Sequence, residues 1–168
     1  FTVPAGDAQL PDYEEYSMEG RTYRFLREQP EFPFGFGLGY APFAYQNLKL
    51  EYTDLPMGED LELSVTVANT GTQEGDEVVQ VYLQHGDSSV RTPVQQLVDF
   101  RRVHIAAGDT ERVHLRIPAD WMRVTFEDGT RHFEDSHFTV TVGGSSPGQR
   151  ARDLGAAPML EAEFHLKR

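Results

Sequence analysis

Apolar and polar residues alternate along the middle of the chain with the period of two that characterises half-buried β-strands. Residues 61–67 carry Leu or Val at every second position, with Glu, Ser and Thr between them, and residues 113–117 and 138–142 repeat this pattern. Residues 77–83 form a Val-rich run, which is typical of a more fully buried strand. Further strands are expected over residues 48–52, 97–105, 124–126, 131–133 and, as one more edge strand, 160–166.

Turn-forming residues separate these segments and indicate the fold class. Gly, Asn and Asp punctuate the pattern at residues 69–71, 107–109 and 128–129. The pair Arg101-Arg102 breaks the alternation of its strand, which predicts a β-bulge there. No stretch has a capped apolar period of 3.6 residues, so little helix is expected. Short strands about ten residues apart predict an all-β, immunoglobulin-like sandwich over residues 43–168, C-terminal tail included.

Residues 1–42, called the strap below, form a long irregular N-terminal extension in this prediction. Proline recurs through the strap and interrupts any regular hydrogen-bond ladder, because it lacks an N–H group. Aromatic side chains are dense in it: Phe1, Tyr13, Tyr16, Tyr23, Phe25, Phe32, Phe34, Phe36 and Tyr40. So much aromatic surface is costly to leave in water. We therefore expect the strap to pack on another body, either the following domain or a neighbour in a longer parent chain.

The net charge of the chain limits the kinds of partner that it is expected to bind. The 168 residues include 15 Lys plus Arg and 27 Asp plus Glu, which gives a net charge of −12. Such an acidic surface repels phosphate backbones and anionic lipid, so no nucleic acid and no membrane is expected as a partner. The absence of Cys excludes disulfides and thiolate chemistry, and no run of 18 apolar residues is present that could span a bilayer.

Paired acidic residues are the first candidates for chemistry, since glycoside hydrolysis needs two carboxylates across a sugar site. Acidic pairs occur here as sequence neighbours, among them residues 14–15, 76–77, 127–128 and 134–135. Neighbours in a strand point to opposite faces, so such a pair does not form a catalytic dyad by itself. We expect a solvated acidic surface and no catalytic residue.

Histidines just before the predicted strand at residues 138–142 are the candidates for metal ligands. His132 and Glu134 are two residues apart on one strand face, and Asp135 and His137 repeat that spacing. Both residue types bind divalent metals. A polar surface strand explains the pattern equally well, so we expect no metal here and leave the His132, Glu134 and His137 site open.

Three other groupings indicate structure rather than chemistry. Residues 85–89 place His, Asp and two Ser in one loop, but no Gly-x-Ser-x-Gly elbow is present and triad members normally come from separate positions. His104 and His114 lie on successive predicted strands and are expected to pair across them. The glycines of residues 35–39 do not follow the Gly-x-Gly-x-x-Gly spacing, so no nucleotide cofactor is expected.

Two motifs in the strap carry a family resemblance. Residues 16–25 read Tyr-Ser-Met-Glu-Gly-Arg-Thr-Tyr-Arg-Phe, and residues 32–40 read Phe-Pro-Phe-Gly-Phe-Gly-Leu-Gly-Tyr. They resemble the C-terminal part of glycoside hydrolase family 3, in which Tyr-x-Met-x-Gly-Arg-Thr-Tyr-Arg-Tyr and Tyr-Pro-Phe-Gly-Tyr-Gly-Leu-Ser-Tyr are common. The resemblance continues through residues 67–71, 75–83 and 142–146, in an order that suits the family's fibronectin type III-like domain. Departures at Gly39, Ala41-Pro42 and residues 134–136 concern loop detail.

The resemblance implies a retaining β-glycosidase of the β-glucosidase or β-xylosidase type. In that family the Asp nucleophile lies in an N-terminal (β/α)8 domain and the acid/base Glu in a following α/β-sandwich domain. Both positions would precede Phe1, so no catalytic residue is carried over and no cofactor is implied. The resemblance favours a secreted or periplasmic protein and leaves a cytoplasmic one open.

Together, the strap and the resemblance predict a non-catalytic C-terminal segment. It would support the upstream catalytic domains and help to shape the substrate entrance, with a β-glucan or xylan oligosaccharide as a possible ligand. Aromatic residues of the strap are the expected interdomain docking residues: Tyr23, Phe25, Phe32, Phe34, Phe36 and Tyr40. The competing hypotheses are a free-standing polysaccharide-binding module and a purely structural β-sandwich without a ligand.

Overall fold

Strands account for most of the regular structure in the computed structural model, which describes residues 2–6, 12 and 14–168. They form a three-stranded sheet in the order β1-β3-β6, a five-stranded sheet in the order β2-β10-β9-β4-β5, and the β7-β8 hairpin. Their bounds are β1 Phe43–Leu50, β2 Asp54–Pro56, β3 Leu61–Asn69, β4 Gly75–His85, β5 Gln96–Ile105, β6 Thr110–Ile117, β7 Val124–Thr125, β8 Arg131–His132, β9 Ser136–Gly143 and β10 Leu160–Lys167. The predicted all-β class is confirmed.

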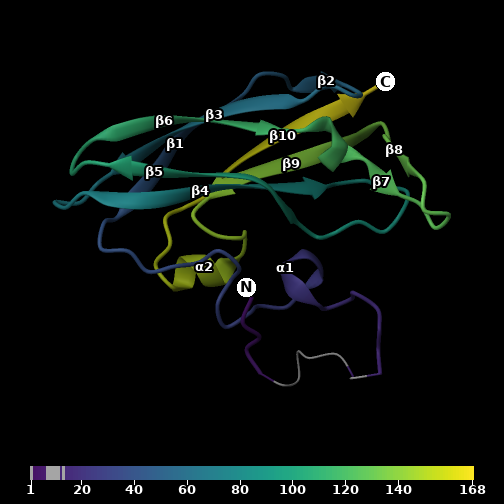
Figure 1. Cartoon of the computed structure of the whole chain (residues 1–168), viewed down its shortest axis with the longest axis horizontal. Coiled ribbons are helices and arrows are strands. Elements are labelled where there is room, and N and C mark those ends of the chain that lie inside the picture. The colour runs from purple at the N-terminus through teal and green to yellow at the C-terminus, as the bar shows by residue number, and fades with distance from the viewer. Residues whose placement is uncertain (1, 7–11, 13) are drawn as a thin grey trace.

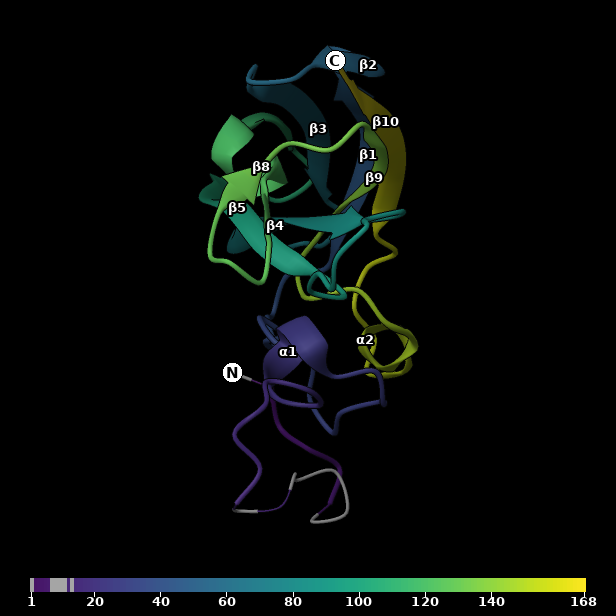
Figure 2. The same cartoon turned by 90° about the vertical axis from the view of Figure 1, so that its right-hand side faces the viewer.

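Helix is confined to short segments in the described part of the chain. These are α1 (Thr22–Phe25), the 3-10 helix Ala119–Met122 and α2 (Gln149–Asp153). Both α-helices lie with the strap on one side of the strands (Figure 1), and the view at right angles shows the same separation (Figure 2). The strap side of the molecule is therefore built from non-strand structure resting on a β-domain.

One hydrophobic core joins the two larger sheets. Alternate residues of β3 and β4 are fully buried in it, as the period-two pattern requires. Strands β6, β9 and β10 contribute further buried side chains, among them Ile117, Val140 and Phe164. The core therefore uses the positions at which the sequence alternation places Leu, Val, Ile and Phe.

Two features of the sheets differ from the sequence prediction. Strand β10 is not an edge strand, because the three-residue strand β2 pairs with it in parallel. The bulge in β5 lies at Val98 rather than at Arg101-Arg102, since the register shifts between the pairs Val81–Asp99 and Tyr82–Leu97. The extra residue directs Asp99 toward β6, where its carboxylate accepts the N–H of Arg116 at 2.9 Å.

The expected pairing of His104 with His114 is also wrong. Strands β5 and β6 belong to different sheets, so the chain crosses from one sheet to the other between these residues. His104 instead lies opposite Asp76 of β4 and contacts its carboxylate at 3.0 Å, whereas His114 lies opposite Ser64 of β3. Two successive strands of similar pattern do not reveal in the sequence whether they share a sheet.

Asp60 connects the start of β3 to the end of β6. One carboxylate oxygen accepts the N–H of Ala119 at 2.6 Å, and the other pairs with the guanidinium of Arg116. The hydrogen bond from the Ala119 backbone, together with Arg116, lowers the pKa of Asp60 below its ordinary value.

This lowered pKa predicts a pH-dependent difference between the chain and an Asp60→Asn variant. A carboxylate with a depressed pKa in the folded state stabilises it above the unfolded pKa of about 3.9, and the effect disappears as pH falls through the folded pKa. Thermal unfolding should therefore give a higher Tm for the unmodified chain at pH 7, with both Tm values converging at the lowest pH. A Tm difference that stays constant down to pH 2 contradicts this assignment; Glu59→Gln, which removes a charge one residue away, is the control.

Candidate interdomain docking site

The inner part of the strap, at Phe34 and Gly35, is fixed to the face of β4 that points away from the core. The carbonyl of Phe34 accepts the N–H of Ser146 at 2.8 Å. Gln80 of β4 donates from Nε2 to the carbonyls of Gly35 and Gly144, at 3.2 and 2.7 Å, and its Oε1 accepts the hydroxyl of Tyr82 at 2.6 Å. A nearly buried amide therefore ties the strap, the end of β9 and β4 together.

Helix α1 fastens the strap to the start of β5 and to the residues just before it. The hydroxyl of Tyr23 accepts the N–H of Leu97 at 3.1 Å, and the carbonyl of Arg24 accepts the N–H of Val94 at 2.7 Å. The Arg24 guanidinium donates to Gln96 Oε1 at 2.9 Å. These contacts join residues at least 70 positions apart, and periodicity alone does not predict them.

Helix α2 supplies a second attachment. Arg150 donates from Nε to the carbonyl of Glu31 at 3.0 Å, and its Nη2 lies 3.1 Å from the Glu31 carboxylate. Near the beginning of the strap, Val3 exchanges backbone hydrogen bonds with the segment at Phe32 and Glu31, at 3.0 and 2.8 Å. The strap thus folds back on itself before it enters β1.

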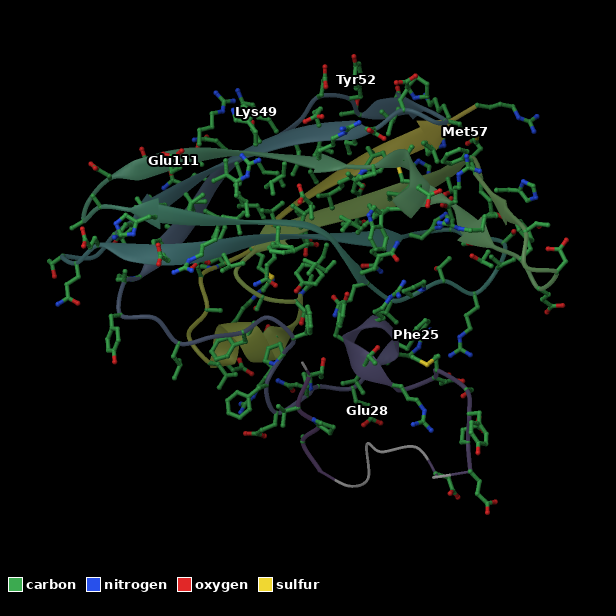
Figure 3. All side chains as sticks on the ribbon, in the orientation of Figure 1. Phe25, Glu28, Lys49, Tyr52, Met57 and Glu111 are labelled. Atoms are coloured by element: carbon green, nitrogen blue, oxygen red, sulfur yellow. The ribbon has the colours of Figure 1, made fainter. Side chains whose placement is uncertain are left out.

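The predicted docking residues divide into an inward and an outward group. The rings of Tyr23 and Phe34 stack with centroids 4.2 Å apart, and Tyr23 meets Tyr82 edge-on at 6.1 Å. Tyr23 therefore contacts this chain's own β-domain, and Phe34 packs on Tyr23. Phe25, half-buried on α1, lies on the strap side of the molecule (Figure 3).

The outward group presents rings to solvent. Phe32 is 43% exposed and stacks on Phe36 at 6.5 Å, and Tyr40 is 99% exposed. Leu38, between them in sequence, is 92% exposed and was not among the predicted docking residues. The docking residues were selected as aromatic side chains, so an aliphatic residue such as Leu38 gave no signal in that pattern.

A groove of about 480 Å³ lies beside these exposed side chains. Its walls are residues 35–42 of the strap, the start of β1, the start of β4 and residues 154–157 after α2. Val78 of β4 contributes a partly exposed apolar side chain to it. The groove therefore joins the outward part of the strap to the edge of the β-domain.

Glu77 and Tyr45 form a polar pair in this groove, which Asp76 also lines. The Tyr45 hydroxyl donates to Glu77 Oε1, which links the three-stranded sheet to the five-stranded one. Burial raises the pKa of the Glu77 carboxyl, partly offset by the Tyr45 hydrogen bond. Burial, with the charge of Glu77 adding to it, also raises the pKa of Tyr45 above its ordinary range. The Glu77 carboxylate is therefore hydrogen-bonded to the Tyr45 phenol at the end of the core.

The structure distributes the candidate metal ligands among different partners. Glu134 accepts hydrogen bonds from Ser88 and Ser89, while His137 Nδ1 lies 3.4 Å from Asp87. The His137 ring stacks on His165 at 4.2 Å, and the His132 ring tilts toward Phe126 at 5.7 Å. Across residues 2–6, 12 and 14–168, no three His, Asp or Glu side chains are grouped as a metal site requires.

The assumed spacing along one strand face is wrong for these residues. Strand β8 ends at His132 and β9 begins at Ser136, so residues 133–135 belong to neither strand. The loop at residues 85–89 likewise gives no triad geometry: its two serines bind Glu134, and His85 Nε2 contacts the hydroxyl of Ser136. Burial lowers the pKa of His85, although the negative charges of Glu134 and Asp87 act to raise it.

The chain is similar to a known domain family and to parts of larger proteins. Residues 77–146 match the model of the fibronectin type III-like domain family. The chain is 37% identical over 152 residues to a β-xylosidase of Formosa agariphila, covering 90% of this chain and 20% of that protein. It is also 37% identical over 150 residues to a xylan 1,4-β-xylosidase of Xylanibacter ruminicola, covering 86% of this chain and 16% of that protein.

Solved structures also match nearly all of this chain with a small part of their own length. A β-glucosidase from Erythrobacter marinus superposes with a TM-score of 0.79 at 26% identity, over 99% of this chain and 21% of that one. The chain thus spans about one fifth of the length of the relatives and structures it matches. Separately, none of the described helices has the length and apolarity needed to cross a bilayer.

Proposed function

Because this chain carries a fibronectin type III-like domain and resembles the C-terminal region of family 3 glycoside hydrolases, we propose that it is the non-catalytic C-terminal segment of such an enzyme. The parent would be a retaining β-glycosidase of the β-xylosidase or β-glucosidase type. The observation that carries the proposal is the coverage: relatives match 86–90% of this chain with only 16–20% of their own length. Most of the parent enzyme would then lie outside this chain.

On this proposal the outward part of the strap docks against the upstream (β/α)8 and α/β-sandwich domains. Its support is the solvent-exposed apolar surface of Phe32, Leu38 and Tyr40, together with Val78 beside the groove. Burying three such side chains contributes about 5 kcal/mol to docking. Residues 1–42 would serve as the joining strap and residues 43–168 as the supporting domain, since β1 begins at Phe43.

We further propose that the docked segment forms part of the wall of the substrate entrance. A β-glucan or xylan oligosaccharide would then reach it as part of the parent enzyme's substrate. In its support, one relative is a xylan 1,4-β-xylosidase, and several others are β-glucosidases.

Hydrolysis assays separate this proposal from its alternatives. The 168-residue chain is expected to show no turnover of p-nitrophenyl β-xyloside or β-glucoside, because no catalytic carboxylate is assigned to it. The product of the same gene extended upstream of Phe1 is expected to hydrolyse one of them. Turnover by the 168-residue chain alone, or a reading frame that encodes nothing upstream, contradicts the proposal.

The docking surface has its own test in the extended product. Replacing Leu38 and Tyr40 together by Ser is expected to lower its Tm by several degrees, because both side chains lose their buried contacts. Tyr52→Ser is the matched control, since Tyr52 is exposed on the side opposite the strap (Figure 3). Equal Tm values for the double variant and the control would show that the strap does not dock there.

A polysaccharide-binding module would instead need several rings in a row on one surface. The exposed rings outside the strap come from three separate elements: Tyr52 precedes β2, Phe100 lies on β5 and Trp121 lies in the 3-10 helix. Retention of the 168-residue chain on insoluble xylan or cellulose would favour that alternative.

A further inference from the structure

Glu77 is a carboxylate without a cation in the groove beside the strap. In the described part of the chain its hydrogen bond comes from the Tyr45 hydroxyl, and no Lys, Arg or His there forms an ion pair with it. Its sequence neighbour differs: Asp76 pairs with Arg102 and with His104, the latter at 3.0 Å. Both carboxylates line the groove, but only that of Asp76 is paired with cations of this chain, which leaves Glu77 to be neutralised from outside.

Glu77 is half-buried, lines the groove and lies against Gly144. A Cβ atom at Gly144 would lie 2.5 Å from Glu77 Oε1, so a side chain there would press on the carboxylate. Tyr45 is buried and holds Oε1, which leaves Oε2 as the oxygen available to a second donor. One oxygen of the carboxylate is thus engaged by this chain, and no described residue donates a hydrogen bond to the other.

The rim of the groove is apolar and aromatic. Leu38 and Tyr40 stand almost fully exposed on the strap side, and Val78 lies on the β4 side. Apolar stems of long side chains pack on such surfaces, and an exposed Tyr ring attracts a cation over its face. A cationic head on a long aliphatic stem is the side chain that matches both the rim and the carboxylate.

We propose that this groove receives an Arg side chain, flanked by apolar residues, from the body on which the strap docks. The guanidinium would donate to Glu77 Oε2, while its stem lies against Leu38 and Tyr40. Arg suits the site better than Lys because a planar guanidinium bonds a carboxylate and stacks on an aromatic ring at once, with less hydration to lose. The inference rests on the proposed function, and about four fifths of each relative's length lies outside this chain to supply the Arg.

The electrostatics of the chain support a cationic occupant. With a net charge of −12, the chain attracts a basic partner surface during encounter. Burial raises the pKa of Glu77, so its charge is incompletely solvated in the groove. A cation at this position would offset that cost, as one does for a partly buried carboxylate in general.

A peptide probe tests the proposal on the 168-residue chain. The probe is acetyl-Leu-Arg-Phe-amide, followed by the amide resonances of the chain at pH 7, with the citrulline peptide as its uncharged analogue. The expected result is saturable shifts at Val78, Gly144 and Ala156, with at least tenfold weaker binding of the citrulline peptide. Equal binding of both peptides, or no localised shift, overturns the proposal.

Variants make the assignment to Glu77 specific. Glu77→Gln keeps an acceptor for Tyr45 and is expected to weaken the Arg peptide at least tenfold, whereas the nearby Glu74→Gln leaves its binding unchanged. Unchanged binding by Glu77→Gln overturns the proposal; if that variant does not fold, the comparison of the two peptides on the unmodified chain decides. None of these outcomes affects the hydrolysis assay, so failure of the Arg site and failure of the proposed function are distinguishable.

Discussion

Replacing Val65 by Asp is expected to unfold the β-domain at room temperature or to leave it only marginally folded. Val65 is 0% exposed and lies on β3, the central strand of the three-stranded sheet, opposite Val113 of β6. An aspartate there is either charged without a partner or neutral in an apolar site, and either state costs several kcal/mol. Domains are stable by about 5–15 kcal/mol, so one such change removes a large part of the total.

Urea unfolding followed by tryptophan fluorescence and circular dichroism measures this loss. The control is Thr66→Asp, one residue along the same strand, where the register places Arg112 directly opposite. Its side chain points to the other face of the sheet, so a change below about 1 kcal/mol is expected. Similar unfolding midpoints for the two variants would mean that β3 does not face the core as described.

Replacing Gly35 by Ala is expected to release the inner part of the strap from β4. Gly35 has φ +75°, a left-handed conformation that costs a residue with a side chain about 1–2 kcal/mol. The added methyl group would also collide with the side-chain amide of Gln80. That amide is held by Gly144 and Tyr82 and cannot move away without breaking their hydrogen bonds. Together these effects amount to about 3 kcal/mol, which increases the open population about a hundredfold.

Limited trypsin digestion measures the release, because Arg21, Arg24 and Arg27 all lie in the strap. The expected result is faster cleavage at these sites while the strands of the β-domain stay protected. Gly37→Ala is the matched control two residues away, where an added methyl group meets nothing within 4 Å. Equal cleavage rates in the two variants would show that the Gln80 contact does not hold the strap.

Strand positions were predictable because burial acts on each strand locally. Leu and Val at alternate positions of residues 61–67 predict the strand observed as β3, and the Val-rich run of residues 77–83 predicts β4. The Asp128-Gly129 turn likewise predicts the β7-β8 hairpin. In each of these cases the residues that determine the element lie within a few positions of one another.

The docking site was predictable only in part. The density of aromatic residues in the strap indicates that they pack on something, but it does not say which ring faces which body. In the structure Tyr23 contacts Tyr82 of β4 and Phe34 stacks on Tyr23, whereas Phe32 and Tyr40 lie at the surface. It also brings Leu38 and Glu77, which the aromatic pattern does not include, to the same groove.

By itself, the sequence determined the all-β class, the main strands and the turns between them, because these depend on period-two burial and local backbone preferences. It also determined the net charge and the absence of thiol chemistry. Only the tertiary structure decided which strands share a sheet, where the β5 bulge falls and which strap side chains turn outward. These depend on contacts between residues far apart in the chain, such as Gly35 with Gln80 and Tyr45 with Glu77, and no local pattern encodes such contacts.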